Sequence, residues 1–376
     1  MPRRKPIAID LFCGTGGMSL GFKQAGFRVV GAFDNEARHI GTYKQNFPSV
    51  PAFTMDLRRV TGGVLLGLID CKREIDLVFG GPPCQGFSVG GKRSLSDERN
   101  LLIREFAKLV GQIKPKYFVL ENVQGLMMGH AIQALNSFVH RMRLRAYRVV
   151  QKIRVLNAAD YGVPQRRRRT FIIGHRSDMP APAYPEPSAI LHESGKPYYP
   201  KVRDAIRDLP IVEKYDELFE QDGYSGSLGE PSYYAKIMRG EIKEACDILP
   251  PRERNGEPLT GCLRTRHGKQ TVDRFRHTEP GTTEPVSRFY RLSYDGLAPT
   301  IRAGTASDHG SHTSPRPIHP EYPRCITVRE AARLHSYPDW FQFHSTRWHA
   351  FRQIGNSVPP RLARFVGLEI LKVIGD

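Results

Sequence analysis

Short apolar runs alternate with segments of helical spacing through the first half of the chain. Each run ends at or near a glycine or an acidic residue, which is typical of a buried strand that enters a turn. Apolar residues with helical spacing lie between the runs, as in residues 101–113 and 131–145. The predicted strands are 7–12, 29–33, 52–55, 75–79, 117–120 and 170–174. This alternation predicts an α/β fold with a mostly parallel, doubly wound sheet and helices on both faces.

The pattern changes at about residue 175. Residues 177–323 are rich in proline, glycine, tyrosine and arginine without a sustained period, which predicts a smaller, loop-rich domain. Helical spacing returns in an amphipathic helix at 327–334, behind a threonine cap, and in a last helix at 361–374. We therefore expect a first domain at 1–180, a second at 181–350 and a C-terminal segment at 351–376 that returns to the first.

The net charge of the chain indicates the kind of partner that it binds. With 56 Lys and Arg against 38 Asp and Glu, a net charge of +18, the chain suits a polyanion, of which nucleic acid is the commonest. A membrane is disfavoured because no long apolar stretch is present and Asp10 interrupts the N-terminal apolar run. The six cysteines show neither zinc-site spacing nor a disulfide framework, so we expect no metal and a reducing, cytoplasmic location.

A cysteine that follows a predicted strand is the first candidate for chemistry. Cys84 stands in the sequence GGPPCQGFS, directly after strand 75–79. Open α/β sheets bind ligands at the carboxyl ends of their strands, and the two prolines fix the backbone in front of the thiol. A lone free cysteine is usually a buried core residue, but this setting favours a reactive thiol.

A glycine loop predicts a cofactor site. Strand 7–12 is followed by the sequence CGTGG and a helix, a layout that exposes backbone N–H groups to a ligand. The dinucleotide fingerprint needs a third glycine where Ser19 stands, so a nicotinamide cofactor is disfavoured. Asp34 lies about 20 residues after the loop, where an acid can hold a ribose or can begin a helix.

Further polar groups follow or precede strands. Glu121 comes directly after a strand and can point into the same crevice as Cys84, although a surface glutamate is usually inert. The sequence QRRRR at 165–169 leads into another strand. If it is extended, Arg167 and Arg169 share one face and the arginines beside them the other; otherwise it is a solvated face or a phosphate patch.

Together these motifs resemble those of the DNA (cytosine-5)-methyltransferases. The resemblance covers both ends of the chain and nearly everything before Gly174, in the family's order. The family usually has alanine at the position of Cys13 and glutamate at that of Asp34, and Glu36 stands two residues further on. The matching segments are DLFCGTGG at 10–17, PPCQ at 82–85, ENV at 121–123, QxRxR at 165–169, REAARL at 329–334 and GNSV at 355–358.

The resemblance implies a reaction and a cofactor. Cytosine C5 is a poor nucleophile, and the thiolate of Cys84 would activate it by adding to C6. Glu121 would hold N3 and the exocyclic amine, and Arg169 would donate to O2, with Arg167 in the same catalytic motif. The methyl donor would be S-adenosylmethionine, in contact with Phe12, Gly14, Gly16, Asp34, Asp56, Leu57, Leu102 and Asn356.

The implied partner is double-stranded DNA, with catalysis in the first domain and target recognition in the second. A base inside a duplex must be extruded to reach the thiol, and the basic segment 85–99 is either a lid over it or an ordinary surface loop. Residues 264–269 and 288–291 are candidates for groove contacts. The resemblance also suggests a nucleoid-associated monomer that works with a cognate restriction endonuclease. The DNA-contacting residues expected near the lid are Gln85, Ser88, Lys92, Arg93 and Arg99.

Three other functions share part of this pattern. An RNA cytosine-5 methyltransferase would use the same chemistry on another substrate. A non-enzymatic DNA-binding protein would need the positive charge but not Cys84, Glu121 and Arg169 together. A small-molecule methyltransferase would keep the glycine loop but would have no use for a basic variable domain. Nothing in the sequence specifies the recognition site.

Overall fold

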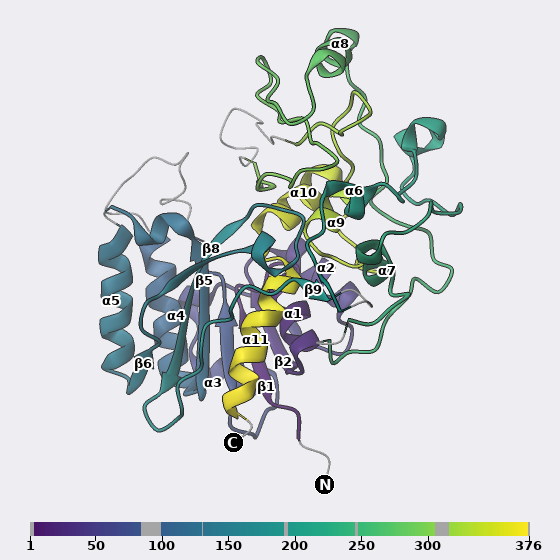
Figure 1. Cartoon of the computed structure of the whole chain (residues 1–376). Coiled ribbons are helices and arrows are strands. Elements are labelled where there is room, and N and C mark those ends of the chain that lie inside the picture. The colour runs from purple at the N-terminus through teal and green to yellow at the C-terminus, as the bar shows by residue number, and fades with distance from the viewer. Residues whose placement is uncertain are drawn as a thin grey trace. The chain divides into compact units, whose positions relative to one another are not determined.

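Two compact units make up the chain. The computed structural model describes residues 4–83, 99–129, 131–191, 195–244, 247–304 and 316–374, and Figure 1 draws its backbone. The first unit comprises Met1–Asn157, Arg168–Glu186 and Leu362–Asp376. The second comprises Ala158–Arg167 and Pro187–Arg361.

One sheet forms the centre of the first unit. Its strands are β1 (Ile7–Leu11), β2 (Arg28–Asp34), β3 (Ala52–Thr54), β4 (Leu77–Gly80), β5 (Tyr117–Val123), β6 (Tyr147–Val149), β7 (Arg154–Asn157) and β8 (Arg168–Arg176). They lie in the order β3-β2-β1-β4-β5-β8-β6, with β7 also paired to β8. Strands β1 to β5 are parallel, β8 is antiparallel to β5, and β6 and β7 are antiparallel to β8. The predicted mostly parallel α/β fold is therefore confirmed.

Helices cover both faces of this sheet (Figure 1). The chain moves from β1 to β2 in one direction and from β4 to β5 in the other, so right-handed crossovers place α1 and α4 on opposite faces. The last helix lies beside α1, because a Cβ atom at Gly367 would be 2.8 Å from the Cβ of Ala25. The helices are α1 (Gly17–Ala25), α2 (Ala37–Asn46), α3 (Gly62–Leu68), α4 (Arg99–Ile113), α5 (Ala131–Arg143) and α11 (Pro360–Ile374).

Aromatic side chains fill both helix–sheet interfaces. On the side of α4 and α5, the ring centroid of Phe118 in β5 lies 6.4 Å from Phe106 and 5.8 Å from Phe138. On the side of α1, Phe79 of β4 stacks on Phe22 at 4.3 Å. All five rings are buried. The central strands are therefore apolar on both faces, as a parallel sheet between two helical layers requires.

The winding of the sheet reverses between β1 and β4. These strands are neighbours, with Leu11 opposite Gly80. A Cβ atom at Gly80 would overlap the carbonyl oxygen of Leu11, so only glycine allows the two backbones to approach this closely. The loops that follow β1 and β4 consequently leave the sheet side by side. This is the edge at which open α/β sheets bind their ligands.

The second unit contains few regular elements among its described residues. Loops occupy most of it, joined by isolated bridges such as the antiparallel one between Thr283 and Tyr290. Its helices and strands are β9 (Ile190–Leu191), β10 (Pro197–Tyr198), α6 (Val202–Ile206), α7 (Tyr233–Arg239), α8 (Lys269–His277), α9 (Val328–Leu334) and α10 (Arg347–Asn356).

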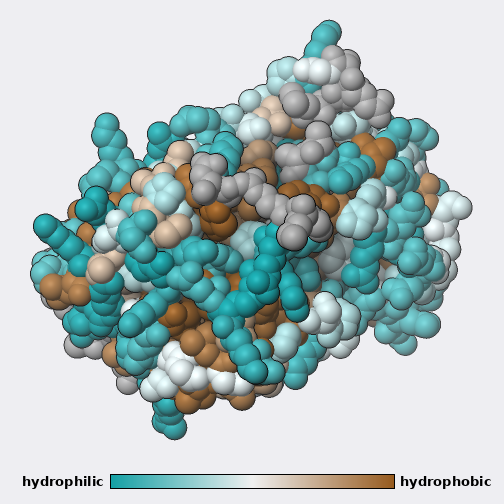
Figure 2. Space-filling view, turned by 90° about the horizontal axis from the view of Figure 1, so that it is seen from below, coloured by the Kyte–Doolittle hydropathy of each residue, from teal (hydrophilic) through white to brown (hydrophobic). Residues whose placement is uncertain are grey.

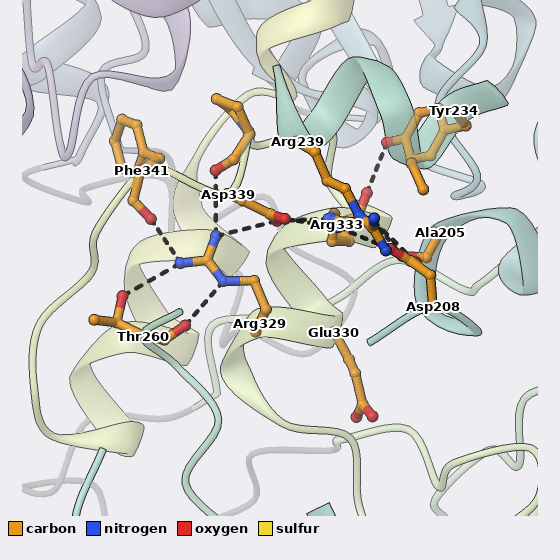
Figure 3. A network of polar contacts seen from close by, with 12 residues as sticks. Ala205, Asp208, Tyr234, Arg239, Thr260, Arg329, Glu330, Arg333, Asp339 and Phe341 are labelled. Atoms are coloured by element: carbon orange, nitrogen blue, oxygen red, sulfur yellow. Dashed lines mark hydrogen bonds and ion pairs between the residues drawn. The ribbon is translucent and has the colours of Figure 1, made fainter. Parts of the chain in front are cut away.

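Helix α9 differs from its prediction in one respect. Its threonine cap is present, because the Thr327 hydroxyl accepts from the amide of Glu330 and the Glu330 carboxylate accepts from the amide of Thr327. The predicted amphipathic character is wrong, since all seven residues of the helix are buried. The cause is internal pairing of its charges: Arg329 donates to the carbonyls of Thr260 and Phe341 (Figure 3).

Arg333 is the centre of the buried network around α9 (Figure 3). Its Nη2 lies 2.7 Å from a carboxylate oxygen of Asp339 and 3.2 Å from one of Asp208. Arg239 of α7 donates to the same Asp208 oxygen. Burial opposes the charge on Asp339, but Arg333 and Arg329 outweigh it and hold the pKa of that carboxyl below its usual value. The network therefore ties α9 to α7 and to the segment after α6.

We predict that Arg333→Met destabilises the protein by about 3–5 kcal/mol, because Asp208 and Asp339 would remain buried without their shared counter-ion. The free energy of unfolding from urea denaturation measures this loss. Arg266→Met is the matched control, since Arg266 and its partner Glu220 are exposed, and it should cost at most about 1 kcal/mol. Equal effects of the two substitutions would contradict a structural role for the network.

Candidate active site

The loop after β1 leaves the sheet at the switch point. Phe12, Gly14 and Gly16 adopt left-handed backbone conformations with φ of 58°, 53° and 92°. Gly16 caps α1, whose first amides are therefore free of intrahelical partners. A Cβ atom at Gly14 would meet nothing within 4 Å. The loop thus offers backbone N–H groups beside open space, which suits a polar cofactor.

Asp34, at the end of β2, supports this loop. Its Oδ2 accepts from the amide of Gly14 at 2.9 Å and its Oδ1 from the amide of Glu36, also at 2.9 Å. The residue is only 8% exposed, and His39 lies 3.2 Å from Oδ1. Glu36 begins α2 and has a carboxylate that is considerably more exposed than that of Asp34. Glu36 is the neighbouring acid that the sequence places two residues beyond Asp34.

A buried hydrogen-bond chain under the glycine loop was not foreseen from the sequence. The Ser19 hydroxyl donates to Asp10 at 2.6 Å and lies 2.7 Å from the Tyr43 hydroxyl. All three residues are buried, and burial raises the pKa of Asp10 well above its usual value. Ser19 occupies the place of the third glycine in the dinucleotide fingerprint. Its hydroxyl satisfies Asp10 there, which a glycine could not do.

The remaining predicted cofactor residues are distributed over three elements. Asp56 pairs with Arg58 at 2.8 Å at the start of a 3₁₀ turn, and Leu57 is buried in the core. Leu102 is half-buried near the start of α4. Asn356 is exposed at the end of α10, in the second unit. The first three therefore belong to the same unit as the glycine loop.

Glu121 and Arg169 form an ion pair at the carboxyl end of β5. The sequence predicted that β5 ends at residue 120, but it continues to Val123 because β8 pairs with it as far as Val123 opposite Arg169. Oε1 of Glu121 lies 3.0 Å from Nε of Arg169, and both side chains are largely buried. The pKa of Arg169 is lowered by burial, and the charge of Glu121 and its hydrogen bond oppose this shift only in part. Two opposite charges are thus held on a rigid sheet.

The chain that leads towards Cys84 is tied to this pair. Nδ2 of Asn122 donates to the carbonyl oxygen of Pro82 at 3.1 Å. A Cβ atom at Gly81 would lie 2.8 Å from Oε2 of Glu121, so any side chain there would displace the carboxylate. Cys84, Gln85, Ser88, Lys92 and Arg93 lie outside the described residues, and Arg99 is described only as the first residue of α4.

Arg167 occupies a different environment from Arg169. It belongs to the second unit and is fully buried. Its guanidinium donates to the carbonyl oxygen of Ile301 at 3.0 Å and to those of Gly355 and Ser357 at 2.7 Å each. Its neighbours in sequence, Arg166 and Arg168, are exposed, as the predicted alternation requires. The contacts of Arg167 are those of a residue that holds three backbone segments together.

Metal and disulfide chemistry find no support in the described part of the chain. Its four cysteines are free, and no three His, Cys, Asp or Glu side chains gather around a possible ion there. Burial raises the pKa of the Cys13 thiol well above its usual value. None of the helices described is long and apolar enough to cross a bilayer. The face shown in Figure 2 is mostly hydrophilic with separate hydrophobic patches.

Comparisons with known proteins agree with this geometry. The family model of the C-5 cytosine-specific DNA methylases matches residues 7–372. The chain is 50% identical to the type II methyltransferase M.XorII of Xanthomonas oryzae pv. oryzae, over 98% of this chain and 85% of that protein. It is 33% identical to the type II methyltransferase M.DdeI of Desulfomicrobium norvegicum, over 95% of this chain and 86% of that protein.

Solved structures show the same fold. A structure described as a candidate DNA modification methyltransferase from an E. coli prophage superimposes with a TM-score of 0.79 at 31% identity, over 99% of this chain and 100% of that one. The S. pombe Dnmt2 methyltransferase superimposes with a TM-score of 0.59 over 99% of each chain, at 17% identity. The second likeness concerns the fold alone.

We predict that Gly16→Ala costs about 2–4 kcal/mol of stability, from left-handed strain and overpacking together. The new methyl group would lie 2.5 Å from Phe47 and 2.8 Å from Tyr43. Gly14→Ala is the matched control, because it introduces the same backbone strain into open space and should cost only about 1–2 kcal/mol. Thermal unfolding of both variants measures the difference, and equal losses would show that Gly16 is not tightly packed.

Proposed function

Because the chain belongs to the C-5 cytosine-specific DNA methylases, we propose that it methylates C5 of a cytosine in duplex DNA through a covalent bond between Cys84 and C6. The observation that carries this proposal is the Glu121–Arg169 pair beside Gly81 and Pro82. A carboxylate and a guanidinium are fixed there, beside Pro82, which stands two residues before Cys84 in the sequence. S-adenosylmethionine supplies the methyl group when it is bound.

The proposed steps balance without a further reactant. The Cys84 thiolate forms a bond to C6, which makes the ring an enamine and C5 a nucleophile. C5 then takes the methyl group, its proton leaves to a base, and the sulfur–carbon bond breaks. The thiolate is regenerated for the next cycle. A base in a stacked duplex cannot offer C6 to a side chain, so the target cytosine must be extruded first.

Glu121 and Arg169 are proposed to bind the polar edge of the extruded cytosine. Glu121 contacts N3 and the exocyclic amine, where attack at C6 demands a hydrogen-bonding partner. Arg169 donates to O2, on which negative charge grows during the attack. Their positions on β5 and β8 are fixed by the sheet register, so little reorganisation is needed when the base enters.

Arg167 is proposed to position rather than to react. Its guanidinium donates to three backbone carbonyls, at Ile301, Gly355 and Ser357. The last two flank Asn356, which is expected at the cofactor. Arg167 would therefore hold the turn that presents Asn356, while Arg169 contacts the base.

The cofactor is proposed to bind along the loop after β1. The residues there fit the group, because the left-handed Gly14 borders open space and the first amides of α1 have no intrahelical partners. We assign the ribose hydroxyls to Glu36 in place of Asp34, since both oxygens of Asp34 accept backbone amides, whereas the carboxylate of Glu36, which accepts the amide of Arg38 through Oε1, is far more exposed. Asp34 then keeps the loop in shape for the ligand. Phe12, Asp56, Leu57 and Leu102 would line the remainder of the site.

We predict that Glu121→Gln lowers methyl transfer by about 10²–10⁴-fold, because the amide keeps the shape of the side chain but cannot serve as an acid or base at N3. DNA binding should survive. Transfer of labelled methyl groups to duplex DNA, with tRNA in parallel to test an RNA substrate, measures the loss. Glu186→Gln is the control, since Glu186 forms an exposed ion pair with Arg154 and should tolerate the change. Undiminished turnover of Glu121→Gln would remove this residue from the mechanism.

We predict that Cys84→Gly abolishes methyl transfer while specific DNA binding stays equal or becomes tighter. The change removes the only atom able to bond to C6 and relieves crowding beside the extruded base. Methyl transfer and gel-shift affinity are measured on the same purified variant. The control is Cys71→Gly, because Cys71 is a half-buried cysteine outside the site and its loss should leave the reaction intact. Residual transfer above a few per cent in folded Cys84→Gly protein would sink the nucleophile assignment.

A further inference from the structure

A short hairpin at residues 281–291 follows α8 in the second unit. The amide of Gly281 donates to Arg291 at 2.8 Å, the amide of Arg291 to Thr282 at 2.8 Å, and the amide of Glu284 to Phe289 at 2.8 Å. An isolated antiparallel bridge between Thr283 and Tyr290 joins the two arms of the hairpin. Residues 285–288 therefore form the tip.

The base of this hairpin is anchored by a buried arginine. Arg291 donates to the carbonyl oxygens of Phe275 at 3.0 Å, Arg276 at 3.1 Å and Thr278 at 2.7 Å, which are orphan acceptors at the end of α8. The rings of Phe275 and Phe289 join α8 and the hairpin in a small apolar cluster. Arg291 is thus occupied inside the fold, although the sequence made it a candidate for groove contacts.

The tip is stiffened by a buried carboxylate. Glu284 is 0% exposed and accepts from the amide of Val286 at 3.1 Å and from both the amide and the hydroxyl of Ser287. Nε of Arg274 in α8 lies 3.2 Å from the same carboxylate. Burial opposes the charge of Glu284, yet these hydrogen bonds and Arg274 hold its pKa below its usual value. A charged and fully satisfied group therefore fixes the turn.

Two side chains at the tip are exposed. Val286 is 68% exposed, so its aliphatic side chain is accessible at the tip. Arg288 is exposed and has no ion-pair partner among the described residues. Its φ is +62°, a left-handed conformation that carries a steric penalty for any residue with a Cβ. Such strain persists only where the surrounding structure imposes it, and here Glu284 does so.

We propose that this hairpin reads base edges in a groove of duplex DNA through Val286 and Arg288. The inference rests on the proposed function, which supplies the duplex. A guanidinium donates to O6 and N7 of guanine together, and an exposed aliphatic group packs on the C5 methyl of thymine. A contact to phosphate alone would need neither an exposed valine nor a rigid, strained tip.

The other arginines suggested by the sequence have contacts within their own unit. Arg264 donates to the carbonyl of Tyr215 and to Asp216, and it stacks over Phe219 at 3.9 Å. Arg266 stacks over the same ring at 4.6 Å and pairs with Glu220. Arg264 is largely buried by these contacts and Arg266 has an exposed partner, whereas Arg288 has no ion-pair partner among the described residues.

The test compares the base preferences of full-length variants on one randomised duplex pool. Each protein methylates the pool with S-adenosylmethionine, and bisulfite sequencing then gives its preference at every position. Arg288→Gly relieves the left-handed strain, so the fold should be retained, as thermal unfolding will verify. Discrimination at a guanine should fall by roughly 10–100-fold while transfer to other sequences persists. Val286→Ala should weaken preference at a thymine, and Arg266→Gly, the matched control, should change neither.

A positioning variant adds a second measurement. Glu284→Gln keeps both tip side chains but loosens the turn, so the same guanine preference should weaken with Arg288 still present. An Arg288→Gly protein with unchanged preference would overturn the proposal. A uniform loss of methyl transfer on all sequences would also overturn it, if the plot of log affinity against log salt concentration becomes shallower by about 1. That combination is the signature of a phosphate contact. Failure of the unaltered protein to methylate any duplex would instead contradict the proposed function.

Discussion

The close approach of β1 and β4 at Leu11 and Gly80 is the constraint on which the first unit depends. The two strands start opposite windings of the chain, so their following loops must leave the sheet at one edge. Glycine at position 80 permits this contact, since a side chain there would overlap the Leu11 carbonyl. The glycine loop and the segment towards Cys84 therefore leave the sheet at the same edge, although about seventy residues separate them.

Buried arginines organise the second unit in a comparable way. Arg167 and Arg291 donate to backbone carbonyls that no strand or helix satisfies, whereas Arg333 neutralises two buried aspartates. A unit of loops leaves many such acceptors, and the guanidinium, with five N–H groups in a fixed plane, satisfies several at once. Part of the net charge of +18 is thus internal. The number of basic residues overstates the surface that is available to DNA.

Charged residues that are neighbours in the sequence differ in the contacts that they make in the structure. Arg167 and Arg169 share a motif, but one is enclosed by carbonyls and the other faces Glu121. Arg288 and Arg291 lie three residues apart in one hairpin, yet only Arg291 is buried. Asp34 and Glu36 also differ, because Asp34 accepts amides of the glycine loop and of Glu36, whereas Glu36 accepts the amide of Arg38 at the start of α2. In each case two neighbouring residues of like charge make different contacts within the fold.

The sequence by itself determined the strands, the main helices, the parallel sheet and the order of the motifs, because these follow from local periodicity and from the short reach of turns. It singled out Glu121 by its place after a strand, and Arg169 through the resemblance of its motif. It failed where burial depends on distant partners: it made α9 amphipathic, ended β5 before Glu121 and overlooked the Asp10–Ser19 pair. Only the tertiary structure decided these points, because a charged residue can be buried when its partner arrives from elsewhere in the chain, and no local pattern records that partner.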